Sequence, residues 1–266
     1  MTEPGPAPFH GYVLCASPRT GSTLLCDLLT ATGVAGAPDS FFMEGLDPHW
    51  AATWGLPKEP RAAQADPAAH ARTFLAAVKK AGRGGSAVFG LRLMHASLPR
   101  LLQMIDTACP GLPTDKARLD WAFGNLLYVH LTRHDKLAQA VSMVKAEQTG
   151  LWHIAPDGTE LERLAPPAAP QYDFARIAAK RAALTAADAD WQDWFRATGI
   201  TPLTLPYEVL AADPAKAVAS LLQALGQDAP RTPPEQATGR LADKTSADWI
   251  SRFKAEAALK PWRPIA

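Results

Sequence analysis

The sequence predicts an α/β fold, with a central and mainly parallel β-sheet that is flanked by helices. Two observations support this prediction. Short apolar runs typical of buried strands alternate along the chain with longer segments whose apolar residues recur at helical spacing. The first run, in YVLCASPRTGSTLL (12–25), leads through a turn rich in hydroxyl residues directly into a helical pattern. We therefore expect parallel βαβ units with a P-loop-like first turn, in a single domain over 1–266.

The predicted elements follow in chain order. The first strand covers 9–16, and the first helix covers 22–32 before a cap at Gly33. Further strands are predicted at 86–94, 125–132 and 200–210. Further helices are predicted at 68–82, 97–108, 135–149, 172–197, 214–225 and 246–258. Two proline-rich segments, 34–70 and 150–171, are predicted to be loops, and loops of that length in a compact domain usually carry function.

Composition argues against several classes of protein. The net charge of +1 gives no overall attraction to nucleic acid or to an anionic membrane, so an anionic ligand has to be held by local charges. No apolar stretch reaches the roughly 18 residues that a membrane span requires. The N-terminus lacks the pattern of a signal peptide, so we expect a cytoplasmic protein. The chain has three cysteines, Cys15, Cys26 and Cys109. Their spacing is typical of neither a disulfide framework nor a zinc site.

The turn between the first strand and the first helix has features that favour anion binding. Free backbone N–H groups and the positive end of a helix dipole meet at such a turn. Gly21 lets the backbone approach an anion closely, and Ser22 and Thr23 add hydroxyl donors. Arg19 adds a fixed charge with forked donor geometry. The alternative is an ordinary strand-to-helix turn with a capping serine.

This turn lacks the lysine of a nucleoside-triphosphate loop. That loop has the pattern G-x-x-x-x-G-K-[ST], and its lysine reaches the β- and γ-phosphates. Here Ser22 stands in the position of the lysine, and Ala16 stands in the position of the first glycine. The turn is therefore suited to an anion shorter than a triphosphate.

A second candidate anion contact follows the strand predicted at 125–132. Arg133 comes directly after this strand, at the carboxyl edge where ligands bind in open α/β sheets. Ser142 lies on the next predicted helix and could join Arg133 on a second phosphate. Taken alone, an arginine after a strand is often only a solvated strand end.

Together these two motifs resemble those of the PAPS-dependent sulfotransferases, where PAPS is 3′-phosphoadenosine 5′-phosphosulfate. Within that superfamily the chain is most similar to the bacterial trehalose sulfotransferase type. ASPRTGSTLL resembles the phosphosulfate loop, and HLTRHDKLAQAVSMVKAEQTGLW (130–152) resembles the 3′-phosphate motif. The similarity extends to YEVL (207–210) and ADKTSADWISRF (242–253), and so covers most of the chain.

The resemblance implies roles for these residues. Arg19, Thr20, Gly21, Ser22 and Thr23 would hold the 5′-phosphosulfate, while Arg133 and Ser142 would hold the 3′-phosphate. It also implies PAPS as co-substrate with PAP (adenosine 3′,5′-bisphosphate) as product, no metal, and a homodimer. The acceptor would be a small molecule or glycan, reached from the loops 34–70 and 150–171. The missing lysine is then explained, because PAPS presents no β,γ-phosphate chain.

The chain departs from the family pattern on the acceptor side. The trehalose enzymes have a glutamate, their proposed base, just before a Phe-Phe pair, and Ser40 occupies that position here. A second acidic position of the family, which helps to hold trehalose, is Ala37. By position, the residues expected to line the acceptor site are Pro18, Ala37, Asp39, Ser40, Phe41 and Trp54.

Three residues are candidates for the missing base. His95 follows the strand predicted at 86–94, and an imidazole pKa near 6.5 suits proton transfer, although a structural role at the strand end is equally open. Asp39 and Glu44 flank the former glutamate position, but loop carboxylates are usually solvated. Arg92 is a candidate for stabilising charge on the sulfuryl group or the leaving phosphate.

The function expected from the sequence is transfer of a sulfuryl group from PAPS to a hydroxyl of a carbohydrate or glycolipid. Two alternatives remain open at this point. A catalytically impaired relative that binds PAPS or another nucleotide is favoured by Ser40 and Ala37. A small-molecule kinase would use the same loop, but the absent lysine argues against it.

Overall fold

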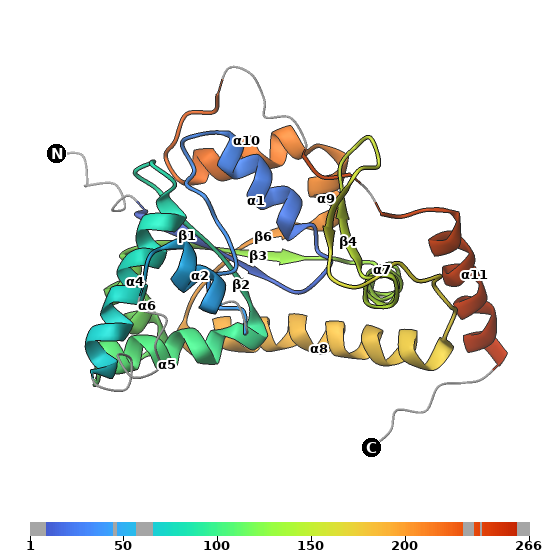
Figure 1. Cartoon of the computed structure of the whole chain (residues 1–266), viewed down its shortest axis with the longest axis horizontal. Coiled ribbons are helices and arrows are strands. Elements are labelled where there is room, and N and C mark those ends of the chain that lie inside the picture. Colours follow the sequence, from blue (N-terminus) through green and yellow to red (C-terminus); the bar gives the residue numbers. More distant parts are fainter. Residues whose placement is uncertain (1–8, 45–46, 57–65, 231–236, 240, 260–266) are drawn as a thin grey trace.

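The computed structural model describes residues 9–44, 47–56, 66–230, 237–239 and 241–259. Its centre is a four-stranded sheet in the order β2-β1-β3-β6 (Figure 1). All three strand pairings in this sheet are parallel. The strands are β1 (Gly11–Ala16), β2 (Phe89–Met94), β3 (Leu126–Thr132) and β6 (Leu203–Pro206). The predicted α/β fold with a parallel sheet is therefore confirmed.

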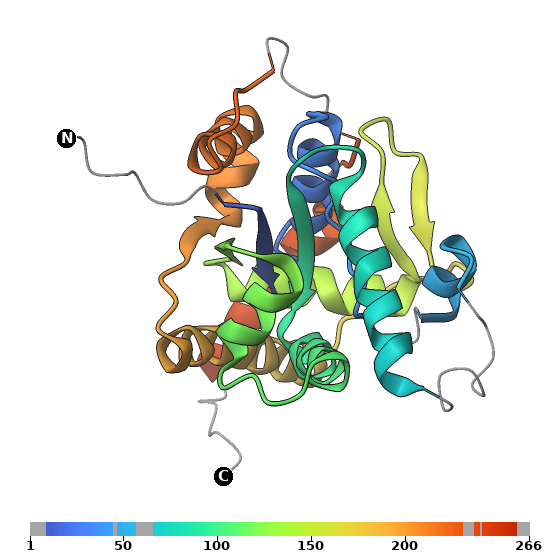
Figure 2. The same ribbon diagram turned by 90° about the vertical axis from the view of Figure 1, so that its left-hand side faces the viewer.

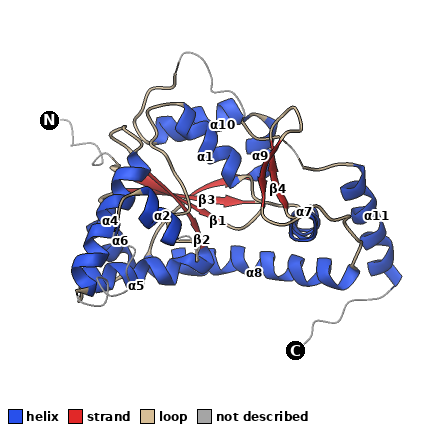
Figure 3. Cartoon of the chain, in the orientation of Figure 1, coloured by secondary structure: helices blue, strands red, loops and turns tan. Residues whose placement is uncertain are grey.

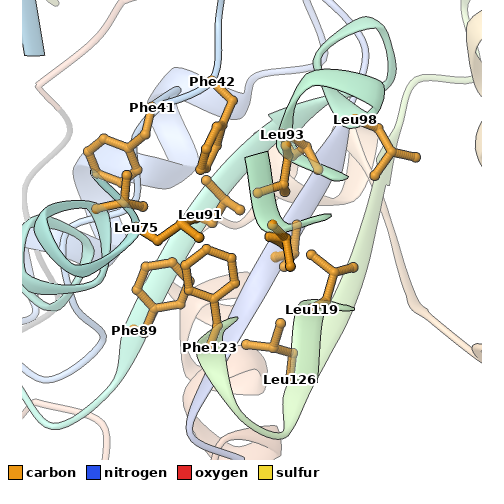
Figure 4. Packing of buried hydrophobic residues seen from close by; sticks show 14 of the residues in the cluster. Phe41, Phe42, Leu75, Phe89, Leu91, Leu93, Leu98, Leu119, Phe123 and Leu126 are labelled. Carbon is orange, nitrogen blue, oxygen red and sulfur yellow. The ribbon is translucent and has the colours of Figure 1, made fainter. Parts of the chain in front are cut away.

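The burial of β1 shows that the sheet is covered on both faces. Every residue of β1 is buried, because a central parallel strand is covered on each side. Val13 and Cys15 point into one apolar cluster, whereas Tyr12, Leu14 and Ala16 point into the other. Figure 4 shows part of the first cluster, in which Phe89 and Phe123 stack with ring centroids 4.6 Å apart.

The helices are layered accordingly. Figures 1 and 2 show α1 and α10 over one face of the sheet and α5 and α8 over the other, and Figure 3 shows how helices surround the short strands. The helices are α1 (Ser22–Ala31), α2 (Asp47–Thr53), α4 (Pro67–Arg83), α5 (Leu98–Ala108), α6 (Asp115–Phe123), α7 (Lys136–Thr149), α8 (Phe174–Thr198), α9 (Tyr207–Ala212), α10 (Pro214–Ala224) and α11 (Lys244–Leu259). A short 3₁₀ turn, η1 (His95–Ser97), follows β2. None of the helices in the described part of the chain has the length and apolar character needed to cross a membrane.

Three sequence predictions of secondary structure were wrong. Segment 150–171 is not a plain loop, because β4 (Leu151–Ile154) and β5 (Glu160–Arg163) pair there as an antiparallel hairpin. Segment 34–70 contains the helix α2, which was not predicted. The strand predicted at 200–210 ends at Pro206, and a helix begins at Tyr207.

The errors over 150–171 and 200–210 have a physical reason, as does the omission of α6. The strand sequence ELER is polar and mostly exposed, so it lacks the apolar alternation by which half-buried strands are recognised. Pro206 ends the strand pairing and serves as the N-cap residue of α9. α6 has little apolar periodicity, and its clearest start signal is the Thr114 side chain, which accepts a hydrogen bond from the Ala117 N–H.

Candidate active site

A cavity of about 1250 Å³ lies where the four parallel strands end. The segment that follows each strand contributes to its lining, as expected for the carboxyl edge of an open α/β sheet. Arg19 comes from the loop after β1, Ser97 from the turn after β2, Arg133 from the segment after β3, and Tyr207 from the start of α9. Residues far apart in the sequence are therefore brought to one edge by the topology.

The loop between β1 and α1 has an unusual backbone. Arg19 has a φ of 64°, and no other described non-glycine residue has a positive φ. Such a conformation is uncommon for a side chain of this size and is typical of functional loops. Gly21 has a φ of 79°, and a Cβ placed there would lie 2.8 Å from Cδ2 of Tyr207. Glycine is required at this position by both its φ and the closeness of the tyrosine ring.

The N-terminus of α1 faces the cavity without a side-chain cap. Gly21 is its N-cap residue, and glycine has no side chain that could accept a hydrogen bond from the first turn. Gly21, Ser22 and Thr23 all line the cavity. The first N–H groups and the positive end of the helix dipole are therefore presented to whatever occupies it. The alternative of a turn capped by Ser22 does not apply, since Ser22 is already the first residue of the helix.

Two arginines meet above this loop. Arg133 Nη1 donates to the carbonyl oxygen of Arg19 at 3.0 Å, and its guanidinium lies 4.4 Å from the centre of the Tyr207 ring. Arg19 Nε donates to Ser142 Oγ at 3.0 Å, and Nη1 donates to the Trp152 carbonyl at 2.9 Å. Ser142 thus contacts Arg19, whereas the sequence grouped it with Arg133.

Burial disfavours the charged forms of these two arginines. Burial, with a further contribution from Arg133, lowers the pKa of Arg19 to about 10, and burial also lowers the pKa of Arg133. Within the described residues, Nε of Arg133 is buried and has no hydrogen-bond partner. Two like charges held together, one with an unused donor, are a configuration that a bound anion would stabilise.

Asp188 on α8 holds this loop in place. Its Oδ1 accepts from Ser17 Oγ at 3.0 Å, and its Oδ2 accepts from Thr132 Oγ1 and from Lys136 Nζ. Gln139 Nε2 completes the network by donating to the Pro18 carbonyl at 2.7 Å. One buried carboxylate therefore connects the ends of β1 and β3.

Sequence reasoning missed Asp188, although a signal for it was present. Asp188 is four residues after Leu184 and three before Trp191, so it lies on the apolar face of α8. Both of those neighbours are buried, as is Asp188. A carboxylate on the buried face of a helix needs polar or charged partners, and that requirement identifies it as a residue of interest.

Arg92 links the loop to the segment after α1. Its Nη1 donates to Thr23 Oγ1 at 2.8 Å, its Nε donates to Ser40 Oγ at 2.8 Å, and its Nη2 lies 3.2 Å from Asp39 Oδ1. Arg92 and Thr23 line the cavity, while Ser40 is buried behind them and Asp39 is not part of the lining. The serine at the former glutamate position therefore serves as a hydrogen-bond acceptor for Arg92.

The other predicted site residues fall into two groups. Pro18 and Glu44 line the cavity. The remaining ones do not: Thr20 is buried and its hydroxyl donates to the Ser17 carbonyl at 2.8 Å, while Ala37 bonds through its N–H to the Gly82 carbonyl. Phe41 and Trp54 pack against each other in the core with ring centroids 5.7 Å apart, and Figure 4 shows Phe41 within that cluster.

His95 also lies outside the lining of the cavity. Its Nδ1 is 3.8 Å from Asp190 Oδ2, and its ring meets Trp191 edge-on with centroids 5.1 Å apart. The next two residues of η1, Ala96 and Ser97, do line the cavity. The roles assigned to His95, Asp39, Glu44 and Arg92 stay predictions.

One pair of cavity residues was not anticipated from the sequence. His153 on β4 has its Nε2 3.2 Å from Thr23 Oγ1 and 3.3 Å from Glu162 Oε2. Both His153 and Glu162 line the cavity. Their segment was predicted to be a loop, and only the pairing of β4 with β5 brings these two side chains together.

The fold and the site define the class of protein: an α/β protein with an uncapped helix N-terminus and several arginines lining one cavity. Comparison with known proteins identifies the family within this class. The model of the Stf0 sulphotransferase family matches residues 11–256. The chain belongs to this family, which confirms the resemblance found in the sequence.

Its relatives include two enzymes named trehalose 2-sulfotransferase. The one from Mycolicibacterium smegmatis is 31% identical over 263 residues, which are 92% of this chain and 95% of that protein. The one from Mycobacterium tuberculosis is 32% identical over 265 residues, with the same shares covered. A solved structure, the sulfotransferase domain of the Synechococcus PCC 7002 olefin synthase, is 16% identical with a TM-score of 0.49, over 100% of this chain and 93% of that one.

Proposed function

We propose that this protein transfers a sulfuryl group from PAPS to a hydroxyl of a trehalose-type sugar. The observation that carries the proposal is the pairing of Arg19 and Arg133 over the uncapped N-terminus of α1. PAPS has two anionic groups, a 5′-phosphosulfate and a 3′-phosphate. A helix N-terminus and two separate arginines offer at least two places for negative charge.

The residues of the cavity suit this donor. Gly21, Ser22 and Thr23 at the start of α1 are the proposed contacts of the phosphosulfate. Arg133 is the proposed contact of the 3′-phosphate, and its unused Nε is a donor that this phosphate would satisfy. Ser142 is proposed to help indirectly as well, since its bond to Arg19 fixes the guanidinium.

Catalysis in this proposal rests mainly on charge and position. As sulfur moves from the donor phosphate to the acceptor oxygen, negative charge grows on the leaving phosphate. Fixed donors around that phosphate stabilise such charge without reorganising. Arg92 is well placed for this role, because its bonds to Thr23 and Ser40 hold the guanidinium at the cavity wall.

The proposed acceptor follows from the relatives, whose names specify trehalose. Ser40 and Ala37 replace two acidic positions of the trehalose enzymes, so we propose a related sugar hydroxyl and make trehalose the first acceptor to assay. Glu44 lines the cavity, and Asp39 is bonded to Arg92, which lines it, so both remain candidates for acceptor contacts. The homodimer and the cytoplasmic location stay predictions.

Calorimetric titration with adenosine 3′,5′-bisphosphate tests the donor site. Binding is expected without added metal, and absence of binding would refute the proposal. Transfer of ³⁵S from labelled PAPS to trehalose and other sugars then tests the reaction. Binding without transfer to any acceptor would indicate a catalytically impaired relative. Magnesium-dependent ATP turnover would indicate the kinase alternative.

A further inference from the structure

The proposed reaction needs a group that takes the proton of the acceptor hydroxyl, and the family position for it is Ser40. Ser40 is buried and accepts a hydrogen bond from Arg92 Nε. A neutral hydroxyl in that setting has no basic function. Some other side chain at the cavity has to supply it, and a positioned base contributes about 10²–10⁴-fold to the rate.

We propose that His153, on the β4–β5 hairpin, is this base, and that the Glu162 carboxylate stabilises the imidazolium that forms. This inference rests on the proposed function above. It adds a catalytic residue from a segment that the family resemblance did not assign, and it makes the hairpin part of the reaction centre.

The geometry places the ring beside the proposed donor site. Nε2 of His153 lies 3.2 Å from Oγ1 of Thr23, which belongs to the first turn of α1. A phosphosulfate at that helix N-terminus would therefore lie close to the imidazole. His95, by comparison, is held by Asp190 and Trp191 outside the cavity lining.

The hydroxyl of Thr23 can support the required tautomer. Thr23 Oγ1 already accepts from Arg92 Nη1 at 2.8 Å, so its own proton can be donated to Nε2 of His153. In that arrangement the neutral ring carries its proton on Nδ1, and Nε2 is its basic nitrogen. Once Nε2 is protonated, it can donate to Glu162 Oε2, which is 3.3 Å away.

The transfer balances with these groups. The acceptor oxygen forms a bond to sulfur while its proton passes to Nε2 of His153. The bond between sulfur and the bridging oxygen breaks, and its electron pair stays on the 5′-phosphate of PAP. Glu162 then faces a positive imidazolium across 3.3 Å and stabilises it by its charge.

Burial and the charge around the ring keep it neutral before the donor binds. Burial, followed by the charges of Arg19 and Arg92, lowers the pKa of His153 to about 4. The charged groups that face it are Arg19 from the first loop, Arg92 from β2 and Glu162 from β5. A bound anion offsets both arginines, so the pKa of His153 is expected to rise toward neutrality when PAP binds.

Two measurements test the inference together. Proton NMR titration of the histidine rings, with His153 assigned from a His153→Gln variant, should give a midpoint near pH 4 in the free protein and a higher one with saturating PAP. In the transfer assay, His153→Gln should lower kcat by about 10²–10⁴-fold while the Kd for PAP changes little. His70→Gln on α4, away from the cavity lining, is the matched control and should keep kcat.

Further variants test whether His153 acts as a base or only supports the structure. Imidazole added to His153→Gly should restore part of the lost rate, which a packing defect would not allow. Glu162→Gln should lower the midpoint of His153 further, because it removes the nearest negative charge. If His153→Gln fails to fold, His153→Asn takes its place.

The outcomes distinguish failure of this inference from failure of the proposed function. A kcat within threefold of wild type in the His153 variant overturns the inference, and so does a large loss of kcat with no effect of PAP on the midpoint. Wild-type protein that binds no PAP would instead refute the proposed function.

Discussion

The two sides of the cavity are held in place by different means. On the proposed donor side (loop 17–21, the start of α1 and Arg133), the buried carboxylate of Asp188 bonds to partners from the loop after β1, from β3 and from α7. On the proposed acceptor side (34–44 and the β4–β5 hairpin), Asp39 has a side chain that is 47% exposed. Buried charge therefore fixes the donor side, whereas the ion pair of Asp39 with Arg92 on the acceptor side is open to water.

The largest expected effect on stability is at Asp188, on the donor side. Asp188→Ala removes one partner of a mostly buried ion pair and leaves Lys136 uncompensated, so the free energy of unfolding should fall by about 3–5 kcal/mol. Urea denaturation measures this. Asp193→Ala on the same helix removes a well-exposed pair with Arg196 and should cost at most about 1 kcal/mol. Equal losses in the two variants would contradict the assignment.

Arg133 tests the donor side by binding. Arg133→Ala removes charged hydrogen bonds worth about 1.5–3 kcal/mol, so the Kd for PAP should rise by roughly 10- to 150-fold. Arg133→Lys keeps the charge without the forked geometry and should fall between wild type and alanine. Calorimetry provides the measurement, and Arg196→Ala, on the exposed surface of α8, is the control. An unchanged Kd in Arg133→Ala would exclude this residue from the site.

Gly21 tests the backbone of the same side. Gly21→Ala introduces a Cβ that would lie 2.8 Å from the Tyr207 ring at a φ of 79°, and overpacking with left-handed strain should cost about 1–3 kcal/mol of stability. Gly33→Ala has a similar φ of 72° but nothing within 4 Å. The difference between their denaturation midpoints isolates the contact with Tyr207. If both variants lose the same stability, that contact contributes nothing.

Asp39 tests the acceptor side, where the smallest structural effect is expected. Asp39→Asn weakens a half-exposed pair with Arg92, so unfolding free energy should change by less than about 1 kcal/mol. The Kd for PAP should stay within twofold, while KM for the sugar rises if Asp39 contacts the acceptor. A loss of PAP affinity as large as that of Arg133→Ala would show that the two sides are not separate.

The same contrast explains what could be predicted from sequence. Loop 17–23 and Arg133 lie directly after strands, so local pattern and topology were enough to bring them to one edge. The positions of Asp188 and His153 depend on how α8 and the hairpin pack, which no local pattern specifies. Trp54 was predicted to face a sugar, yet it packs on Phe41 and Phe74, since a loop tryptophan gains more from apolar neighbours than from solvent.

The hairpin has one more consequence. β4 and β5 form a two-stranded sheet of their own, and in the described chain neither strand pairs with the central four. No residue of β4 or β5 belongs to either of the apolar clusters on the faces of the central sheet, so we expect substitutions in the hairpin to leave that sheet and those clusters intact. The hairpin nevertheless provides a carbonyl to Arg19, from Trp152, and the imidazole of His153 to the cavity. A substitution in such an appendage can alter the chemistry of the cavity at little cost to folding.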